Sequence, residues 1–256
     1  MADEVRYEVD GHVATVTLNR PEQRNAISPE VASALGEAVA ALERDPQVWL
    51  GILTGEGGIF SAGADLKAIA AGRASELSVE PGGFAGFVRY PRTKPFIAAV
   101  RGFALAGGTE LALACEFIVA GTDSAFGLPE VTRGIVAAAG GLFRLPRVLP
   151  RARALELIAT GDRLPADEAL RHGMVNAVVE PDDVLPTARR LAARICANAP
   201  IAVRESLMLA RHALEISDDE GWRRSAAASE RIRGTADAAE GPRAFAEKRA
   251  PVWQGR

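Results

Sequence analysis

Two glutamates stand where a carboxylate could act on a bound substrate. Glu110 follows Gly107-Gly-Thr and begins a helical pattern that is otherwise apolar, and Glu130 follows the proline of Phe126-Gly-Leu-Pro. A pair of carboxylates can serve as general base and general acid. Each glutamate alone could equally well compensate the positive end of a helix dipole. The pair therefore acquires meaning only from its surroundings.

Three glycine-rich junctions follow predicted strands. They are Phe60-Ser-Ala-Gly-Ala-Asp-Leu, Arg101-Gly-Phe-Ala-Leu-Ala-Gly-Gly-Thr-Glu-Leu and Gly134-Ile-Val-Ala-Ala-Ala-Gly-Gly. Small residues let the backbone approach a ligand closely, and the first N–H groups of a helix lack intrahelical partners and favour negative charge. The first two junctions could thus supply an oxyanion hole. Neither is a dinucleotide fingerprint or a P-loop, which disfavours nucleotide-phosphate chemistry.

Alternating and uninterrupted apolar runs predict the elements that must position these residues. A hairpin around Asp10-Gly11 is followed by a helix that Ser28 caps and Pro29 opens, because both residue types favour a helix start. Beyond Gly140 the pattern is helical except at one strand. The predicted strands are 5–9, 12–18, 48–53, 96–100, 117–120 and 175–179, and the predicted helices are 29–42, 65–70, 109–114, 142–149, 151–160, 166–172 and several between 182 and 245. The glycine-rich stretches 55–58 and 72–86 are expected to be mobile surface segments that could form a lid.

Composition bounds the class of protein. The 256 residues are 48% hydrophobic and 25% charged, with a net charge of −3, which is typical of an ordinary globular protein. The length fits one domain, or one domain with a helical appendage, and the order of predicted elements indicates an α/β core followed by a helical C-terminal region. A small negative net charge does not attract nucleic acid or an anionic membrane through long-range electrostatics. The first residues lack a secretory pattern and no charge-free run has membrane-spanning length, so the expected location is the cytoplasm. Cys115 and Cys196 lie in apolar runs and are predicted to be buried.

Nucleophilic catalysis is disfavoured by the residues that could support it. No Gly-x-Ser-x-Gly elbow follows a predicted strand. The three histidines lie at a hairpin, before a helix-ending glycine and within a helix. We therefore interpret His12, His172 and His212 as structural residues.

Taken together, the motifs resemble the crotonase superfamily from about Val13 to the end of the chain. The resemblance implies a spiral of β-β-α units that binds acyl-CoA thioesters, here residues 1–195. A helical region, residues 196–256, would mediate trimerisation and close the CoA site. The motifs that carry the resemblance are Asn19-Arg-Pro with Asn25-Ala, Phe60-Ser-Ala-Gly-Ala-Asp-Leu-Lys, Lys94-Pro-Phe-Ile-Ala-Ala-Val-Arg-Gly, Ala106-Gly-Gly-Thr-Glu-Leu and Phe126-Gly-Leu-Pro-Glu.

The resemblance also implies a role for individual residues. The backbone N–H groups of Ala64 and Gly107 would form the oxyanion hole. Arg24 and Lys67 would face the CoA phosphates or adenine, unless they are simply solvated surface charges. The remaining substrate-binding residues implied are Ala62, Asp65 and Leu66 along the CoA tail, Gly134 and Ala138 near the acyl group, and Phe245 and Lys248, which in relatives reach the CoA of a neighbouring subunit. A homotrimer or a dimer of trimers follows from the resemblance alone.

The reaction implied is the reversible addition of water to the α,β double bond of an enoyl-CoA, because hydratases of this superfamily carry glutamate at both matching positions. Glu110 would take a proton from water and Glu130 would protonate Cα, with no metal or redox cofactor. The C-terminal stretch from Asp237 and Pro81-Gly-Gly-Phe also look like carnitinyl-CoA dehydratases. That activity, an isomerase that uses Glu130 alone and a catalytically silent acyl-CoA binder stay as alternatives.

Three alanines depart from the superfamily pattern. Ala106 stands where many members have a glycine, Ala137 replaces a frequent proline, and Ala138 replaces an often polar or glycine residue near the acyl group. The last two changes alter the wall of the acyl pocket. Small side chains there could admit a bulky acyl chain.

Overall fold

The computed structural model describes residues 4–256, and a six-stranded sheet forms its centre. The strand order is β1-β2-β3-β6-β8-β11, with β1 antiparallel to β2 and every other neighbouring pair parallel. The predicted α/β class is confirmed. The strands of this sheet are β1 (Val5–Asp10), β2 (Val13–Leu18), β3 (Leu50–Gly55), β6 (Phe96–Val100), β8 (Phe117–Gly121) and β11 (Ala177–Val179).

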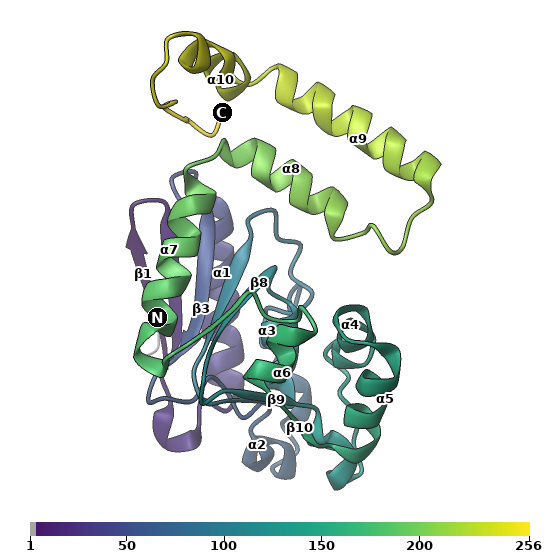
Figure 1. Ribbon diagram of the computed structural model, residues 1–256. Helices are drawn as coiled ribbons and strands as arrows, with labels where there is room; N and C mark the ends of the chain where they lie inside the picture. The colour runs from purple at the N-terminus through teal and green to yellow at the C-terminus, as the bar shows by residue number, and fades with distance from the viewer. Residues whose placement is uncertain (1–3) are drawn as a thin grey trace.

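Helices account for most of the remaining regular structure (Figure 1). Their predicted positions are confirmed, with ends shifted by a few residues. The α-helices are α1 (Pro29–Arg44), α2 (Leu66–Ala70), α3 (Gly107–Leu113), α4 (Gly141–Val148), α5 (Arg151–Thr160), α6 (Ala166–Arg171), α7 (Val184–Cys196), α8 (Pro200–Ala210), α9 (Asp218–Arg233) and α10 (Ala236–Ala246). The 3-10 helices in the described part of the chain are η1 (Pro21–Gln23), η2 (Ala74–Leu77), η3 (Pro129–Arg133) and η4 (Pro181–Asp183).

Helix α1 forms where its local signals predict it. The Ser28 side chain accepts a hydrogen bond from the Val31 N–H at 3.2 Å, and Pro29 occupies the first turn. Apolar residues recur on one face of the helix, among them Leu35 and Leu42, and both are fully buried. The helix therefore gains most of its stability from packing that face onto the sheet.

The central sheet is covered on both faces. On one face Leu50, Ile52 and Ile97 pack against Ala188 and the other small residues of α7. On the opposite face a larger core joins the sheet to α1 and α3. Burial on both faces explains why β3 and β6 are nearly continuous apolar runs rather than alternating ones.

A second, small sheet was not predicted. Its strands are β7 (Phe103–Leu105), β9 (Ala125–Gly127) and β10 (Arg163–Pro165), in the order β10-β9-β7. The prediction that only one strand follows Gly140 is therefore wrong. Three-residue strands carry too few side chains to show a period, and β10 even ends in a proline. They exist because each pairs with a segment distant in sequence.

The stretch 72–86 was predicted to be surface, and that prediction is wrong for its second half. Strands β4 (Ser78–Val79) and β5 (Gly83–Phe84) pair there, and Ala85 and Phe87 are completely buried. Gly86 lies against Gly36 of α1, where a Cβ atom would come within 2.6 Å of the Gly36 Cα. The glycines thus permit close packing on α1 instead of forming a free loop.

Both cysteines are half-buried rather than buried as predicted. Cys115 follows the end of α3, and its Sγ lies 3.4 Å from the Leu111 carbonyl oxygen. Burial nevertheless raises the pKa of the Cys115 thiol to about 12. Neither cysteine lines the large cavity described below.

The C-terminal helices extend beyond one end of the core, with α8 and α9 antiparallel to each other (Figure 1). Helix α9 has no buried residue, and α8 has only Pro200. Helix α7 ends at Cys196, so the division between residues 195 and 196 falls in its last turn and stays a prediction. Among residues 4–256 we find no helix long and apolar enough to cross a bilayer.

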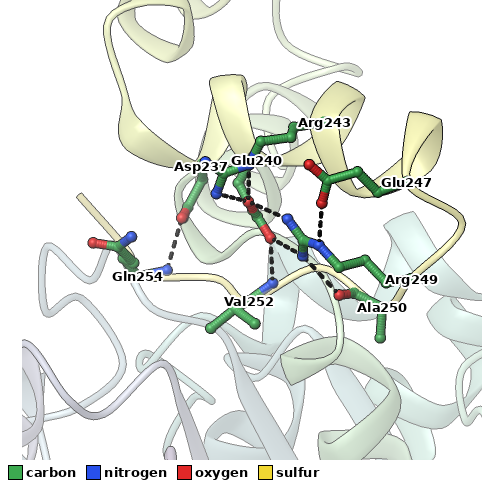
Figure 2. Close-up of polar contacts among 8 residues, drawn as sticks. All are labelled: Asp237, Glu240, Arg243, Glu247, Arg249, Ala250, Val252 and Gln254. Carbon is green, nitrogen blue, oxygen red and sulfur yellow. Dashed lines mark hydrogen bonds and ion pairs between the residues drawn. The ribbon is translucent and has the colours of Figure 1, made fainter.

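The last residues fold back onto α10 through two buried carboxylates, Glu240 and Asp237 (Figure 2). Glu240 accepts hydrogen bonds from Arg243, Arg249 and the Val252 N–H. The side chain of Asp237 accepts the N–H groups of Gln254 and Gly255 at 2.7 and 2.9 Å. These bonds give the C-terminal tail a defined path.

Candidate active site

A cavity of about 1180 Å³ brings the predicted chemistry together. Both glutamates line it, together with the two predicted oxyanion donors. Its walls come from the junction after β3, the start of α3, η3 and the start of α4. The predicted residues on its wall are Arg24, Ala62, Ala64, Asp65, Leu66, Lys67, Gly107, Glu110, Glu130 and Ala138.

The two predicted oxyanion donors are free to bind a ligand. Gly107 is the first residue of α3, so its N–H has no intrahelical partner. The Ile27 N–H donates to the Gly63 carbonyl at 2.8 Å, which leaves the Ala64 N–H of the same trans peptide pointing the opposite way. Within residues 4–256 neither N–H has a hydrogen-bond acceptor.

The two donors also lie close to each other. A Cβ atom on Gly63 would come within 2.7 Å of the Gly107 backbone nitrogen. Gly63 has a φ of +87°, in the region that favours glycine. A side chain at this position would therefore push the two donor loops apart. Two such N–H groups suit an oxygen on which negative charge develops.

Glu110 is held in the first turn of α3 and is 3% exposed. Its Oε1 accepts the Gly141 N–H at 2.9 Å, so the carboxylate is tied to the start of α4. Burial raises the pKa of Glu110 to about 7, and the neighbouring Glu130 charge adds to the rise. The N–H groups of Gly141 and Ala139 oppose it.

Glu130 lies in the 3-10 helix η3 and is 7% exposed. Burial raises its pKa as well. Its Oε2 is buried and has no hydrogen-bond partner among residues 4–256. An unpaired buried carboxylate oxygen is costly unless a ligand satisfies it. Both glutamates are therefore placed to share protons with a molecule bound in the cavity.

The predicted CoA-side residues lie along one side of the cavity. Arg24 has a left-handed φ of 53° at the end of η1 and is exposed. Asp65 caps α2 by accepting the Lys67 N–H at 2.9 Å and also bonds Arg20. Leu66 is half exposed, so the mouth of the cavity has an apolar contact next to its cations.

Three predicted substrate residues do not line the cavity. Gly134 is the left-handed C-cap of η3, and its neighbours Arg133 and Ile135 line the wall in its place. Phe245 and Lys248 belong to the C-terminal region, where both are exposed. Any contact they make with substrate would have to occur in another copy of the chain.

Several lining residues carry no sequence signal that points to a site. They include Leu77 and Phe84 from the stretch 72–86, which was predicted to be surface, and Val88 just beyond it. Arg144 of α4 also lines the cavity, and it donates to the carbonyls of Val88 at 2.7 Å and Ala139 at 3.2 Å. Only its position three residues after a glycine-rich junction could have suggested it. None of the three histidines lines the cavity.

Comparisons with known proteins place this site in context. A family model described as enoyl-CoA hydratase/isomerase matches residues 8–256. Proteins named carnitinyl-CoA dehydratase from Salmonella arizonae and Salmonella typhi are 43% and 44% identical, over the full length of both chains.

Solved structures agree on the fold. A structure of an enoyl-CoA hydratase from Mycobacterium marinum is 46% identical, covers 99% of this chain and 100% of its own, and superposes with a TM-score of 0.95. A carnitinyl-CoA hydratase from Mycobacterium avium is 44% identical, covers both chains fully and has a TM-score of 0.78. The predicted spiral fold is confirmed.

Replacing Ala106 by glycine should stabilise the protein. Ala106 has φ 51° and ψ −126°, a conformation that strains any residue with a Cβ atom by about 1–3 kcal/mol. The added freedom of a glycine in the unfolded chain costs about 0.4–1 kcal/mol, so Ala106→Gly should gain about 1 kcal/mol in urea unfolding. The matched control Ala104→Gly, in strand β7, should instead lose stability. Equal losses in the free energy of unfolding for both variants would show that the Ala106 backbone is not strained.

Glu110→Gln should stabilise the protein more at pH 8 than at pH 5. Because the folded-state pKa of about 7 lies above the ordinary 4.5, the unfolded chain ionises first as pH rises, and stability is lost through this window. The substitution removes that loss, so its benefit should grow by about 2 kcal/mol between the two pH values. Urea unfolding at both pH values measures the difference. A benefit independent of pH would mean that the Glu110 pKa is ordinary.

Proposed function

Because the chain belongs to the enoyl-CoA hydratase/isomerase family, we propose that it catalyses reversible addition of water across the α,β double bond of an enoyl-CoA thioester. The observation that carries this proposal is the pair Glu110 and Glu130, two buried carboxylates on one cavity wall beside two free N–H groups. An isomerase needs only one carboxylate, and a silent binder needs neither. As a crotonase-family hydro-lyase, this protein acts on acyl-CoA substrates.

Each element of the site has a role in the hydration step. Glu110 accepts a proton from the attacking water, and Glu130 donates a proton to Cα. Attack at Cβ develops negative charge on the thioester oxygen, which the N–H groups of Ala64 and Gly107 stabilise most strongly in the transition state. Dehydration uses the same groups with their proton roles exchanged.

The raised pKa values suit this exchange. A pKa of about 7 for Glu110 lets the carboxyl group hold or release a proton near neutral pH. Two neighbouring carboxylates that ionise separately can hold one proton between them, available for Cα or for a leaving hydroxide. For hydration the charged form of Glu110 is required, so activity in this direction should rise with pH through about 7.

For the acyl group, the first candidate is the trimethylammonium chain of carnitinyl-CoA and its dehydrated form, crotonobetainyl-CoA. Its support is that the curated relatives quoted above bear the name carnitinyl-CoA dehydratase and match the whole chain. Hydration and dehydration of this pair use the same two carboxylates. This substrate therefore requires the same catalytic groups and differs only in what the cavity wall around the acyl group must bind.

The second candidate is an uncharged enoyl-CoA, which the aliphatic part of the cavity wall can contact. Aromatic faces attract a quaternary ammonium, and the rings that line this cavity are those of Phe84 and Phe143. Glu80 is paired with Arg89, and the Phe143 ring already carries the guanidinium groups of Arg144 and Arg147 at 5.3 and 5.2 Å. Ala138 and its aliphatic neighbours line the same wall. These aliphatic side chains suit a hydrocarbon chain.

Glu110→Gln and Glu130→Gln should each lower hydration by about 10²–10⁴-fold, because each removes one proton-transfer group. The assay follows loss of the enoyl-thioester absorbance with crotonyl-CoA and, separately, with crotonobetainyl-CoA. Selective turnover of crotonobetainyl-CoA would support the first acyl candidate. Glu37→Gln, an exposed change on α1, is the matched control and should retain full activity.

Two outcomes would contradict the hydratase proposal. Double-bond migration by the wild-type protein without hydration, kept in Glu110→Gln, would support an isomerase that uses Glu130. Binding of both thioesters by the wild-type protein without any turnover would support a silent acyl-CoA binder.

We further propose that the protein is a homotrimer or a dimer of trimers, in which the C-terminal region of one subunit covers the CoA site of the next. Leu214 between α8 and α9, Trp222 on α9 and Phe245 on α10 are 79%, 77% and 86% exposed, which leaves large apolar side chains on the surface of the C-terminal region. Lys248 lies two residues beyond α10 and would bring a positive charge to the CoA phosphates.

Trp222→Glu should therefore shift the assembly toward smaller species. A buried charge in a subunit interface costs several kcal/mol, which is enough to dissociate a marginal contact. Light scattering coupled to size exclusion should give the wild-type protein a mass that is a multiple of three subunits. Arg223→Glu, the neighbouring exposed change, is the control for added charge. A monomeric wild-type protein would contradict the proposal.

A further inference from the structure

We propose that Ser61 is a positioning residue that holds both oxyanion donors in register, a role that rests on the hydration chemistry proposed above. Ser61 is fully buried and does not line the cavity. It stands between the junction that carries Ala64 and the strand that leads to Gly107. Its side chain hydrogen-bonds the residue before Ala64, and its backbone hydrogen-bonds the strand that precedes Gly107.

The hydroxyl group orients the first donor. Ser61 Oγ accepts the Gly63 N–H at 3.1 Å and donates to the Asn25 carbonyl at 2.8 Å. The Gly63 carbonyl in turn accepts the Ile27 N–H. Because the N–H and the carbonyl of Gly63 are both hydrogen-bonded, the peptide that follows is fixed and directs the Ala64 N–H into the cavity.

The backbone of Ser61 orients the second donor. Its N–H donates to the Phe103 carbonyl at 3.1 Å, and its carbonyl accepts the Leu105 N–H at 3.0 Å. Strand β7 is therefore tied to Ser61 immediately before the Ala106 turn that opens α3. The spacing between the Gly107 and Ala64 nitrogens is thus set through a single residue.

The acceptor of the Ser61 hydroxyl is itself immobilised. Asn25 is buried in a left-handed conformation, and its side-chain amide donates to the carbonyls of Glu56 at 2.9 Å and Ile59 at 2.6 Å. Its Oδ1 accepts the Arg20 N–H at 2.9 Å. The Asn25 carbonyl is therefore held in a fixed position. The Ser61 hydroxyl bonds to it and so fixes the loop that carries Gly63 and Ala64.

Ser61→Ala tests this role, because it removes the donor and the acceptor together while keeping the backbone bonds. We expect kcat to fall about tenfold to hundredfold, since small misplacements and lost oxyanion donors have effects of this size. KM should change by less than about threefold, because the walls of the cavity are untouched. Ser61→Cys keeps a side chain of similar shape with a weaker hydrogen-bonding group, so its kcat should lie between those of the wild-type protein and Ser61→Ala.

A chromophoric ligand separates positioning from general damage. The absorption of 4-(dimethylamino)cinnamoyl-CoA moves to longer wavelength when its carbonyl is polarised by hydrogen bonds, so the shift on binding reports the oxyanion hole directly. The wild-type protein should give a large shift, and Ser61→Ala a clearly smaller one at saturating ligand.

Ser124 provides a matched control. Its buried hydroxyl accepts the Gly121 N–H at 3.0 Å and donates to the Val100 carbonyl at 2.9 Å, the same pattern as Ser61, but neither partner lies next to Ala64 or Gly107. Ser124→Ala should lower the thermal midpoint to a similar extent while leaving kcat and the spectral shift unchanged.

The outcomes are distinct. A Ser61→Ala variant that keeps the wild-type spectral shift would overturn the inference, whether or not its kcat falls. If the wild-type protein shifts the ligand but hydrates no enoyl-CoA, and the shift is lost in Ser61→Ala, the inference stands and the proposed function fails.

Discussion

Two backbone N–H groups without partners must point at the same place, and much of the structure around the cavity meets that constraint. A buried N–H that bonds to nothing is costly, so its neighbours have to be paired to keep it in position. The carbonyls of Gly63, Ser61 and Gly127 each accept a backbone N–H. What is left free is one donor at Ala64 and one at Gly107, which belong to segments that are distant in sequence.

The short β7-β9-β10 sheet helps to hold these two N–H groups in place. It is too small to contribute much stability, but strand β7 holds the entry to α3 against the junction after β3. The Thr109 hydroxyl adds a second tie, because it accepts the Gly127 N–H of β9 at 3.0 Å. The strained Ala106 turn between them is tolerated because both of its sides are fixed.

The catalytic carboxylates impose an opposite cost. Burial raises the pKa of both glutamates, so their charged forms destabilise the fold in the pH range where they react. The Gly141 N–H recovers part of this cost for Glu110, whereas one oxygen of Glu130 is left for the substrate. The central sheet and its two covering layers supply the stability that makes such a site tolerable.

Local patterns in the sequence determined the helices, the long buried strands, the family motifs and the identity of the two glutamates. Caps, apolar periods and glycine-rich junctions act within a few residues, so α1 and β6 are readable directly. Only the tertiary structure decided that residues 82–88 are largely buried, that the three-residue strands exist, that Gly134 misses the cavity, and that Ser61 joins both donors. Each of these depends on contacts between segments tens of residues apart, and a local pattern contains no information about such contacts.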